Sequence, residues 1–193
     1  PPDLDRRARP RDVGGAAGLM SDLAAHFRAM ARNNGWANAR LLGACERLSA
    51  SAFAAERTGF FPSLARTLNH ILAVDRYYLD ALEEGGRGRA VYDAPEIAEA
   101  AALRAAQAAE DARLIAFCDR LDAERLTREV PTDRGEGGLW MERVDALLAH
   151  LFQHQIHHRG QAHAMLAGTD VAPPQLDDFF LLYERAPDAR PDS

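Results

Sequence analysis

Four long stretches of this 193-residue chain carry apolar residues at helical spacing, and this pattern limits its fold most narrowly. We expect helices over about residues 21–48, 62–84, 93–120 and 140–167. Alanine and leucine are abundant while β-branched residues are few, which also favours helix. Four amphipathic segments joined by short or medium connections predict an all-α fold, a four-helix bundle.

Capping residues suggest where these helices begin and end. Ser21 can cap the first helix, and Pro62 fits the first turn of the second. The DAPE sequence at 93–96 has the form of a capping box with proline in the first turn, which predicts the start of the third. Gly168 is a stop for the fourth. Between the third and fourth helices, residues 127–139 predict a short irregular or hairpin excursion.

The two ends of the chain differ in composition from its middle. Residues 1–19 contain proline, glycine and a basic cluster, which is typical of a disordered N-terminal tail. We expect one helical domain over 20–185 and a polar tail over 186–193. The apolar segment 179–183 needs cover, either from its own bundle or from a second copy in a homodimer.

Composition excludes several classes of function. The net charge of −6 is unfavourable for nucleic-acid binding. All 23 basic residues are arginine, a coding bias typical of a GC-rich bacterial genome, so a catalytic lysine is excluded. Cys45 and Cys118 lie far apart, which indicates a reducing cytoplasm and not a disulfide framework. No apolar run approaches the ~20 residues that cross a bilayer, and the start is unlike a signal peptide, so we expect a cytoplasmic protein without membrane contact.

Five of the seven histidines fall within residues 150–163. His154 and His158 lie about 40° apart around a helix, so both imidazoles can reach one metal ion. His150 extends the same row by one turn and remains a competitor as a ligand. His157 fits a supporting hydrogen bond, and His163 faces away from the pair. The chain has no HExxH sequence, so the zincin arrangement is absent.

Two ligands on one helix require a third from another helix. Outside the 150–163 group, only His26 and His70 remain. His70 lies on the second predicted helix, next to its apolar stripe, whereas His26 fits a structural role. The sequence therefore indicates His70 as the third ligand, with His150 as the alternative.

At these residues the chain resembles the DinB/YfiT-like family of bacterial metalloenzymes, a damage-inducible family unrelated to the DNA polymerase of the same name. The similarity lies in NHILAVD at 69–75 and HQIHHRGQ at 154–161, with further matches in WAN at 36–38, PPQLD at 173–177 and the apolar segment 179–183. The resemblance implies an up-down-down-up four-helix bundle over about 20–185. It also implies that His70, His154 and His158 are the metal ligands.

Three imidazoles leave a coordination position free for water or substrate, which is typical of a catalytic site. Zinc or nickel fits these ligands best, and iron or manganese with extra waters is an alternative. The resemblance implies a metal-dependent transferase that adds a low-molecular-weight thiol to a small electrophile. A hydrolase that activates water and a non-catalytic metal-binding stress protein are the alternatives. His150, Asp75 and Tyr77 are candidate helpers in catalysis.

Overall fold

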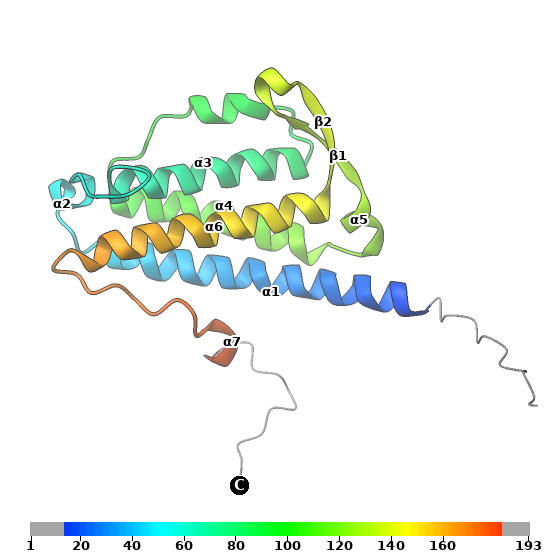
Figure 1. The fold of residues 1–193 in the computed structure, drawn as a ribbon, viewed down its shortest axis with the longest axis horizontal. Helices are drawn as coiled ribbons and strands as arrows, with labels where there is room; N and C mark the ends of the chain where they lie inside the picture. The colour runs from blue at the N-terminus through cyan, green and yellow to red at the C-terminus, as the bar shows by residue number, and fades with distance from the viewer. Residues whose placement is uncertain (1–13, 183–193) are drawn as a thin grey trace, which may run out of the picture.

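The computed structural model describes residues 14–182, in which four long helices form a bundle (Figure 1). These helices are α1 (Gly14–Cys45), α3 (Leu64–Leu82), α4 (Ala100–Asp119) and α6 (Val144–Ala167). Helix α1 packs against α4 and α6, and α3 packs against the same two helices. Helices α1 and α6 run in one direction while α3 and α4 run in the other, which is the up-down-down-up order. The predicted bundle is confirmed.

A long crossover joins α3 to α4, because two parallel helices need a connection that returns along their length. It contains the short 3₁₀ helix η1 (Gly88–Asp93), which packs on α3 and appears in green along the outer edge of the bundle in Figure 1. Between α1 and α3 lies the short helix α2 (Ala50–Ala54), capped by Ser49. The crossover and the loop after α2 both border α3.

Two helix starts differ from those predicted. Helix α1 begins at Gly14, upstream of Ser21, so residues 14–19 are helical and not part of a disordered tail; residues 1–13 lie outside the described part. Helix α3 begins at Leu64, because the Ser63 hydroxyl accepts from the backbone N–H of Arg66 and caps the helix there. Pro62 therefore precedes the cap and does not occupy the first turn.

The third predicted helix start is wrong for a tertiary reason. Helix α4 begins at Ala100, and Asp93 belongs to η1 instead. The Asn69 amide bonds the backbone of Ile97 twice: its oxygen accepts from the N–H at 2.8 Å and its nitrogen donates to the C=O at 2.9 Å. This pairing holds the chain extended on α3, so the helix-starting signal at 93–96 is overridden.

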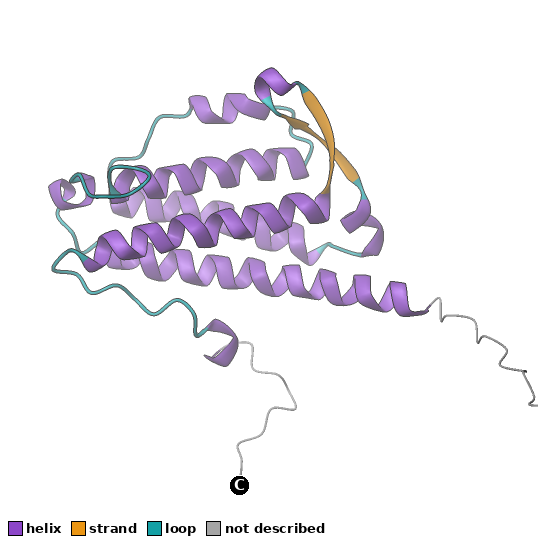
Figure 2. Cartoon of the chain, viewed as in Figure 1, coloured by secondary structure: helices purple, strands orange, loops and turns teal. Residues whose placement is uncertain are grey.

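The excursion before α6 is a hairpin, as predicted, but it is longer (Figure 2). After the short helix α5 (Ala123–Thr127), strand β1 (Glu129–Asp133) pairs antiparallel with β2 (Leu139–Arg143) through a turn that includes η2 (Gly135–Gly137). Trp140 pairs with Thr132 in this ladder, so α6 begins at Val144 and not at Trp140.

The core consists of two apolar clusters with polar side chains between them. One cluster includes Ala31, Val74 and Leu114, and the other includes Leu41 and Leu103. At the C-terminal end of the described chain, helix α7 (Phe179–Leu182) contacts α1. There Phe179 is 4% exposed and its ring lies 5.7 Å from that of Trp36, so the chain's own bundle covers this side chain. Across residues 14–182, no helix has the length and apolarity to cross a membrane.

Candidate metal centre

Three histidines from two helices converge at one point on the bundle. His70 comes from α3, and His154 and His158 come from α6. One ring nitrogen of each lies within 4.8 Å of the others, and the Nε2 atoms of His70 and His154 are 3.0 Å apart. Among the described residues, this histidine cluster is the only group of three potential metal-ligating side chains placed so closely.

The bundle creates the histidine cluster by packing α3 against α6. Successive turns of α6 carry His154 and His158, whose ring centroids lie 4.4 Å apart. The His70 ring lies 4.9 Å from that of His154 and 4.7 Å from that of His158. All three rings therefore contact each other, as the helical spacing and the need for a ligand on a second helix predicted.

The surroundings keep these imidazoles uncharged. Burial, together with the neighbouring His158, lowers the pKa of His70 to about 4. The same two causes lower the pKa of His154 to about 3, and burial lowers the pKa of His158 as well. Neutral imidazoles have a lone pair to offer, so at neutral pH the histidine cluster is in the protonation state that metal binding requires.

Gln161 fixes the tautomer of His158. Its Oε1 lies 2.9 Å from Nδ1 of His158, and because an amide oxygen only accepts, that Nδ1 must carry the proton. The Gln161 amide nitrogen lies 3.1 Å from Nε2 of His157 and donates to it. This leaves Nε2 of His158 free as a ligand. His157 thus has the supporting position predicted for it.

The other predicted residues have separate places. His150 is exposed, and its ring lies 6.3 Å from that of His154. Tyr77 is buried, and its hydroxyl donates to the backbone carbonyl of Asp133. His26 is exposed on α1, while His163 donates from Nε2 to the carbonyl of Pro174 at 2.9 Å. His150 is therefore the only candidate helper with an exposed side chain.

The histidine cluster has one apolar side and two cavities. The Phe61 ring lies 4.3 Å from that of His70 and 5.6 Å from that of His158, so it shields both from solvent. One cavity of about 190 Å³ reaches His70, and another of about 210 Å³ reaches His154. Tyr92, from η1, lines both and separates them.

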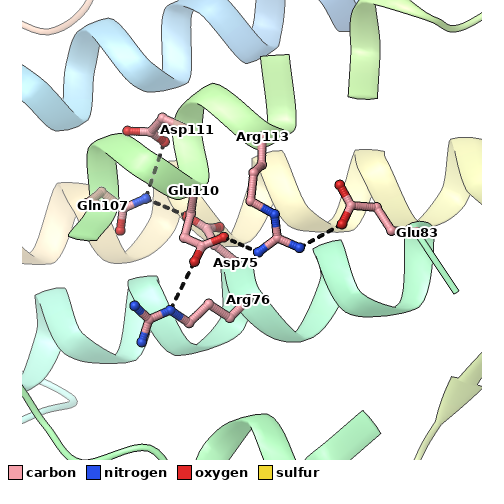
Figure 3. A network of polar contacts seen from close by, with 7 residues as sticks. All are labelled: Asp75, Arg76, Glu83, Gln107, Glu110, Asp111 and Arg113. Atoms are coloured by element: carbon pink, nitrogen blue, oxygen red, sulfur yellow. Dashed lines mark hydrogen bonds and ion pairs between the residues drawn. The ribbon is translucent and has the colours of Figure 1, made fainter. Parts of the chain in front are cut away.

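Behind the histidine cluster lies a buried group of polar side chains, the polar layer, which lies between the two apolar clusters. Its members come from all four long helices: Asn34, Asn38, Asp75, Gln107, Asp111, Gln155 and Arg159. Gln107 donates to Asp75 at 2.7 Å and to Asp111 at 3.2 Å, as Figure 3 shows. Arg159 donates to Asn34 at 2.6 Å and to Asn38 at 2.9 Å, and both of these amides donate to Asp111.

The polar layer adjoins the histidine cluster through Gln155, which follows His154 and donates to Asp75. Burial and the charge of Asp111 raise the pKa of Asp75 to about 7, so the carboxyl is largely protonated below that pH. Gln155 Oε1 is the buried atom of this layer that lacks a partner. Turning the Gln155 amide over would let it accept the Asp75 proton. Asp75 therefore faces the interior and reaches the histidine cluster only through Gln155.

The histidine cluster has the composition that a divalent ion requires. Of two facing Nε2 atoms 3.0 Å apart only one can donate, so without an ion one ring carries its proton on Nε2 and the other accepts with its lone pair. A cation 2.0–2.1 Å from each nitrogen, the usual Zn–N distance, would receive both lone pairs. His154 Nδ1 is buried without a partner among the described residues, so no hydrogen bond to that atom fixes the tautomer of this ring.

Sequence reasoning found the three histidines but not their surroundings. Gln161 lies three residues after His158 on the same helical face, so spacing could have identified it as that ring's partner. Phe61 and Tyr92 come from loops, where no periodicity indicates the direction of a side chain. These neighbours became visible only in three dimensions.

Comparisons with known proteins bear on the family and the fold. The model of the DinB family matches residues 20–189. Protein DinB of Bacillus subtilis (strain 168) is 26% identical over 148 residues, covering 72% of this chain and 85% of that protein. The fold is similar to a DinB-like protein from Bacillus cereus ATCC 10987, with a TM-score of 0.60, 17% identity and coverage of 75% and 91% of the two chains. A DinB-like protein from Bacillus subtilis gives a TM-score of 0.52 at 18% identity, with 80% and 96% covered.

Proposed function

We propose a metal-dependent enzymatic function for this chain, which belongs to the DinB family. In this proposal His70, His154 and His158 bind one divalent ion, with zinc or nickel as the best match to the ligands. The reaction is the transfer or addition of a nucleophile, a low-molecular-weight thiol or water, to a small electrophilic substrate.

The observation that carries the proposal is the meeting of three imidazole nitrogens within 4.8 Å. Three protein ligands leave room for an exogenous one, whereas closed structural zinc sites commonly use four. A divalent ion held by these three histidines would supply Lewis acidity, which would make a bound thiol or water more acidic. The adjoining cavities provide space for reactants on either side of Tyr92.

The chain's own residues supply orientation, shielding and a site for a proton. Gln161 holds the proton on Nδ1 of His158 and so directs Nε2 of that ring toward the centre. Phe61 keeps water from one side of the rings. His150 lines the cavity beside His154 and is exposed, so it can accept the proton that the nucleophile loses.

The chain's own cysteines are unsuited to be the nucleophile. Cys45 and Cys118 are buried in the two apolar clusters, and burial raises the pKa of each thiol to about 12. Because the thiolate is the reactive form, neither side chain is active near neutral pH. Thiol chemistry at this site therefore requires a small thiol from solution.

The first test is metal analysis of the purified full-length chain and of single alanine variants. We expect about one divalent ion per chain in the wild type. His70→Ala, His154→Ala and His158→Ala should each retain less than about a tenth of it. His26→Ala, an exposed histidine on α1, is the matched control and should keep the full content. Full metal content in His70→Ala would remove that residue from the ligand set.

The second test separates an enzyme from a metal-binding protein. Wild type and His158→Ala are compared in reactions of small thiols with electrophiles such as chlorodinitrobenzene, and in ester hydrolysis without thiol. A rate that depends on His158 in the first reaction supports thiol transfer, and in the second supports hydrolysis. Equal rates in both proteins, alongside stoichiometric metal in the wild type, would exclude the enzymatic proposal.

A further inference from the structure

The cavity beside His154 is lined by side chains that donate hydrogen bonds. Its volume is about 210 Å³, and η1, α3, α6 and the hairpin turn all contribute to it. The lining includes no carboxylate; it consists of Val74, Tyr77, Tyr78, Arg89, Tyr92, Arg134, His150 and His154. Two guanidinium groups and three phenols therefore surround a small space at one edge of the histidine cluster.

Several of these donors have no acceptor in the described part of the chain. The guanidinium of Arg89 makes neither an ion pair nor a hydrogen bond with any residue in 14–182, and its Cζ lies 5.7 Å from the Tyr92 ring centre. Within the same residues, the Tyr92 hydroxyl also has no partner. The Tyr78 hydroxyl accepts from Arg134 at 3.2 Å, and its own proton has no acceptor among the described residues. Arg89 and Tyr92 are both exposed, so their donors are open to a ligand that accepts several hydrogen bonds.

The other arginines that line the two cavities form ion pairs with carboxylates, which makes Arg89 different. Arg134 forms an ion pair with Glu142 at 2.7 Å. In the cavity on the other side of Tyr92, Arg76 pairs with Glu110 at 3.1 Å. Arg66 in that second cavity likewise pairs with Glu96 at 3.1 Å. Arg89 forms no such ion pair among the described residues, although the charge of the nearby Asp133 carboxylate acts on it. It lines the cavity that touches His154.

The fold holds Arg89 in place by docking η1 on the hairpin turn. The Asp133 carboxylate accepts from the backbone N–H of Arg89 at 3.0 Å and from that of Gly135 at 2.8 Å, so both its oxygens are engaged by backbone. Gly135 has φ +66°, and a Cβ there would lie 2.9 Å from Cδ of Arg89. A Cβ on Gly88 (φ +52°) would lie 2.6 Å from Oδ2 of Asp133. The lack of side chains at Gly88 and Gly135 thus permits η1 to approach the hairpin turn closely, with the Arg89 side chain against Gly135.

We propose that this cavity binds the carboxylate of a small organic acid, with Arg89 as its principal partner and Tyr78 and Tyr92 as additional donors. An arginine fork matches the two oxygens of a carboxylate. A volume of about 210 Å³ is enough for a small carboxylic acid. The inference rests on the proposed function in one respect: because His154 lines the same cavity, an acid bound there lies beside the metal position. One of the two reactants is then a carboxylic acid.

The test measures binding without turnover, so it stands even if the chain proves inactive. Benzoate and its uncharged counterpart benzamide are titrated into the as-purified full-length chain by calorimetry, with metal content measured on the same sample. We expect benzoate to bind at least about tenfold more tightly than benzamide. Arg89→Gln should abolish that difference and leave the metal content and the melting temperature unchanged.

Arg87→Gln is the matched control, because Arg87 is an exposed arginine of the same crossover that does not line this cavity. It removes the same charge and should bind benzoate as the wild type does. Equal affinity for benzoate and benzamide would overturn the proposal, and so would unchanged benzoate binding in Arg89→Gln. The second result would mean that benzoate reaches the metal or another surface.

A second pair of probes identifies which reactant carries the carboxylate. 3-Mercaptopropanoate and 2-mercaptoethanol are both thiols, but only the first is an acid. If Arg89→Gln weakens the binding of 3-mercaptopropanoate at least about tenfold and leaves the binding of 2-mercaptoethanol unchanged, the carboxylate belongs to the thiol. If the binding of benzoate depends on Arg89 and the binding of neither thiol does, the carboxylate belongs to the electrophile.

Discussion

The histidine cluster and the polar layer are neighbours in the bundle, joined where Gln155 follows His154, but they differ in how their polar atoms are satisfied. In the polar layer, Asp111 accepts three hydrogen bonds, and Arg159 donates to two amides. In the histidine cluster, two Nε2 atoms face each other at 3.0 Å, and Nδ1 of His154 has no partner among the described residues.

This difference indicates which region needs a ligand. The polar layer contains two carboxyl groups and one guanidinium, and a proton on Asp75 brings their charges close to balance. Once the Gln155 amide is turned so that its oxygen accepts the Asp75 proton, this layer can be buried without any added group. Three neutral imidazoles that face one another offer lone pairs and no charge. The polar layer is suited to holding four helices together, and the histidine cluster to binding a cation.

The largest expected effect comes from breaking the polar layer. Arg159 is 5% exposed, so Arg159→Met leaves Asp111 and two amides without their cation. We expect the free energy of unfolding to fall by about 2–6 kcal/mol, because two buried amide oxygens lose their donor at about 1–3 kcal/mol each. Denaturant unfolding of the metal-free proteins measures it.

Arg104→Met is the control for that loss. Arg104 pairs with Glu46 at 2.7 Å on the exposed surface, and such pairs contribute about 0–1 kcal/mol. The folded fraction of Arg159→Met should still bind metal, since no ligand is changed. If the two substitutions cost the same, the polar layer does not have the structural role described above.

The dependence of stability on pH should have opposite signs in the two regions. Asp75 has a pKa near 7 when folded and near 3.8 when unfolded, so the folded state keeps a proton that the unfolded state loses, and stability falls as pH rises through this window. His70 and His154 have pKa values of about 4 and 3 when folded and 6.5 when unfolded. For them the unfolded state binds more protons, and stability falls as pH drops below 6.5.

Single variants separate these opposing pH dependences. One titrating group changes the free energy of unfolding by up to ~1.4 kcal/mol per pH unit. In the metal-free wild type the two partly cancel between pH 4 and 6.5. Asp75→Asn should leave the histidine slope, with stability rising as pH increases. His154→Gln should shift the balance toward Asp75 and Asp111, because burial raises the pKa of Asp111 to about 6 and only His70 opposes them, so stability should fall as pH increases toward 6. Unfolding midpoints measured across pH 4–8 test both, and identical profiles in both variants would contradict the assignment.

The smallest expected effect concerns the contact that orients His158. Gln161→Ala removes the acceptor of the Nδ1 proton and leaves all three ligands in place. Loss of such a supporting bond typically weakens metal affinity about 10–100-fold. Competition with a chelator measures it, and Gln153→Ala, an exposed glutamine on the same helix, is the control. An unchanged affinity would mean that packing against Phe61 is sufficient to fix the ring.

The sequence predicted those parts of the fold that depend on local periodicity. One long first helix was predicted despite Gly35, and α6 ends at Ala167 before Gly168 as expected. Prediction was wrong at the start of α4, because the decisive contact is made by Asn69, far away on α3. The capping pattern at 93–96 is local, so it cannot reveal that a residue on another helix binds the same segment.

The same limit applies to the site. His154 and His158 could be paired from spacing alone, and His70 from the need for a second helix together with a family resemblance. Arg89 could not be identified, because its place depends on the crossover docking on the hairpin turn through Asp133. Residues on helices were therefore predictable, and residues on connections were not.

The crossover between α3 and α4 divides the site into parts that can change independently. It contributes Arg89 and Tyr92 to the cavities, but none of the three histidines and no member of the polar layer. It is anchored by Asn69 near one end and by Asp133 near the other. Between those anchors, substitutions can alter which molecules enter without altering the helices that position the metal ligands. Such a bundle can change what enters its cavities while it keeps one histidine cluster.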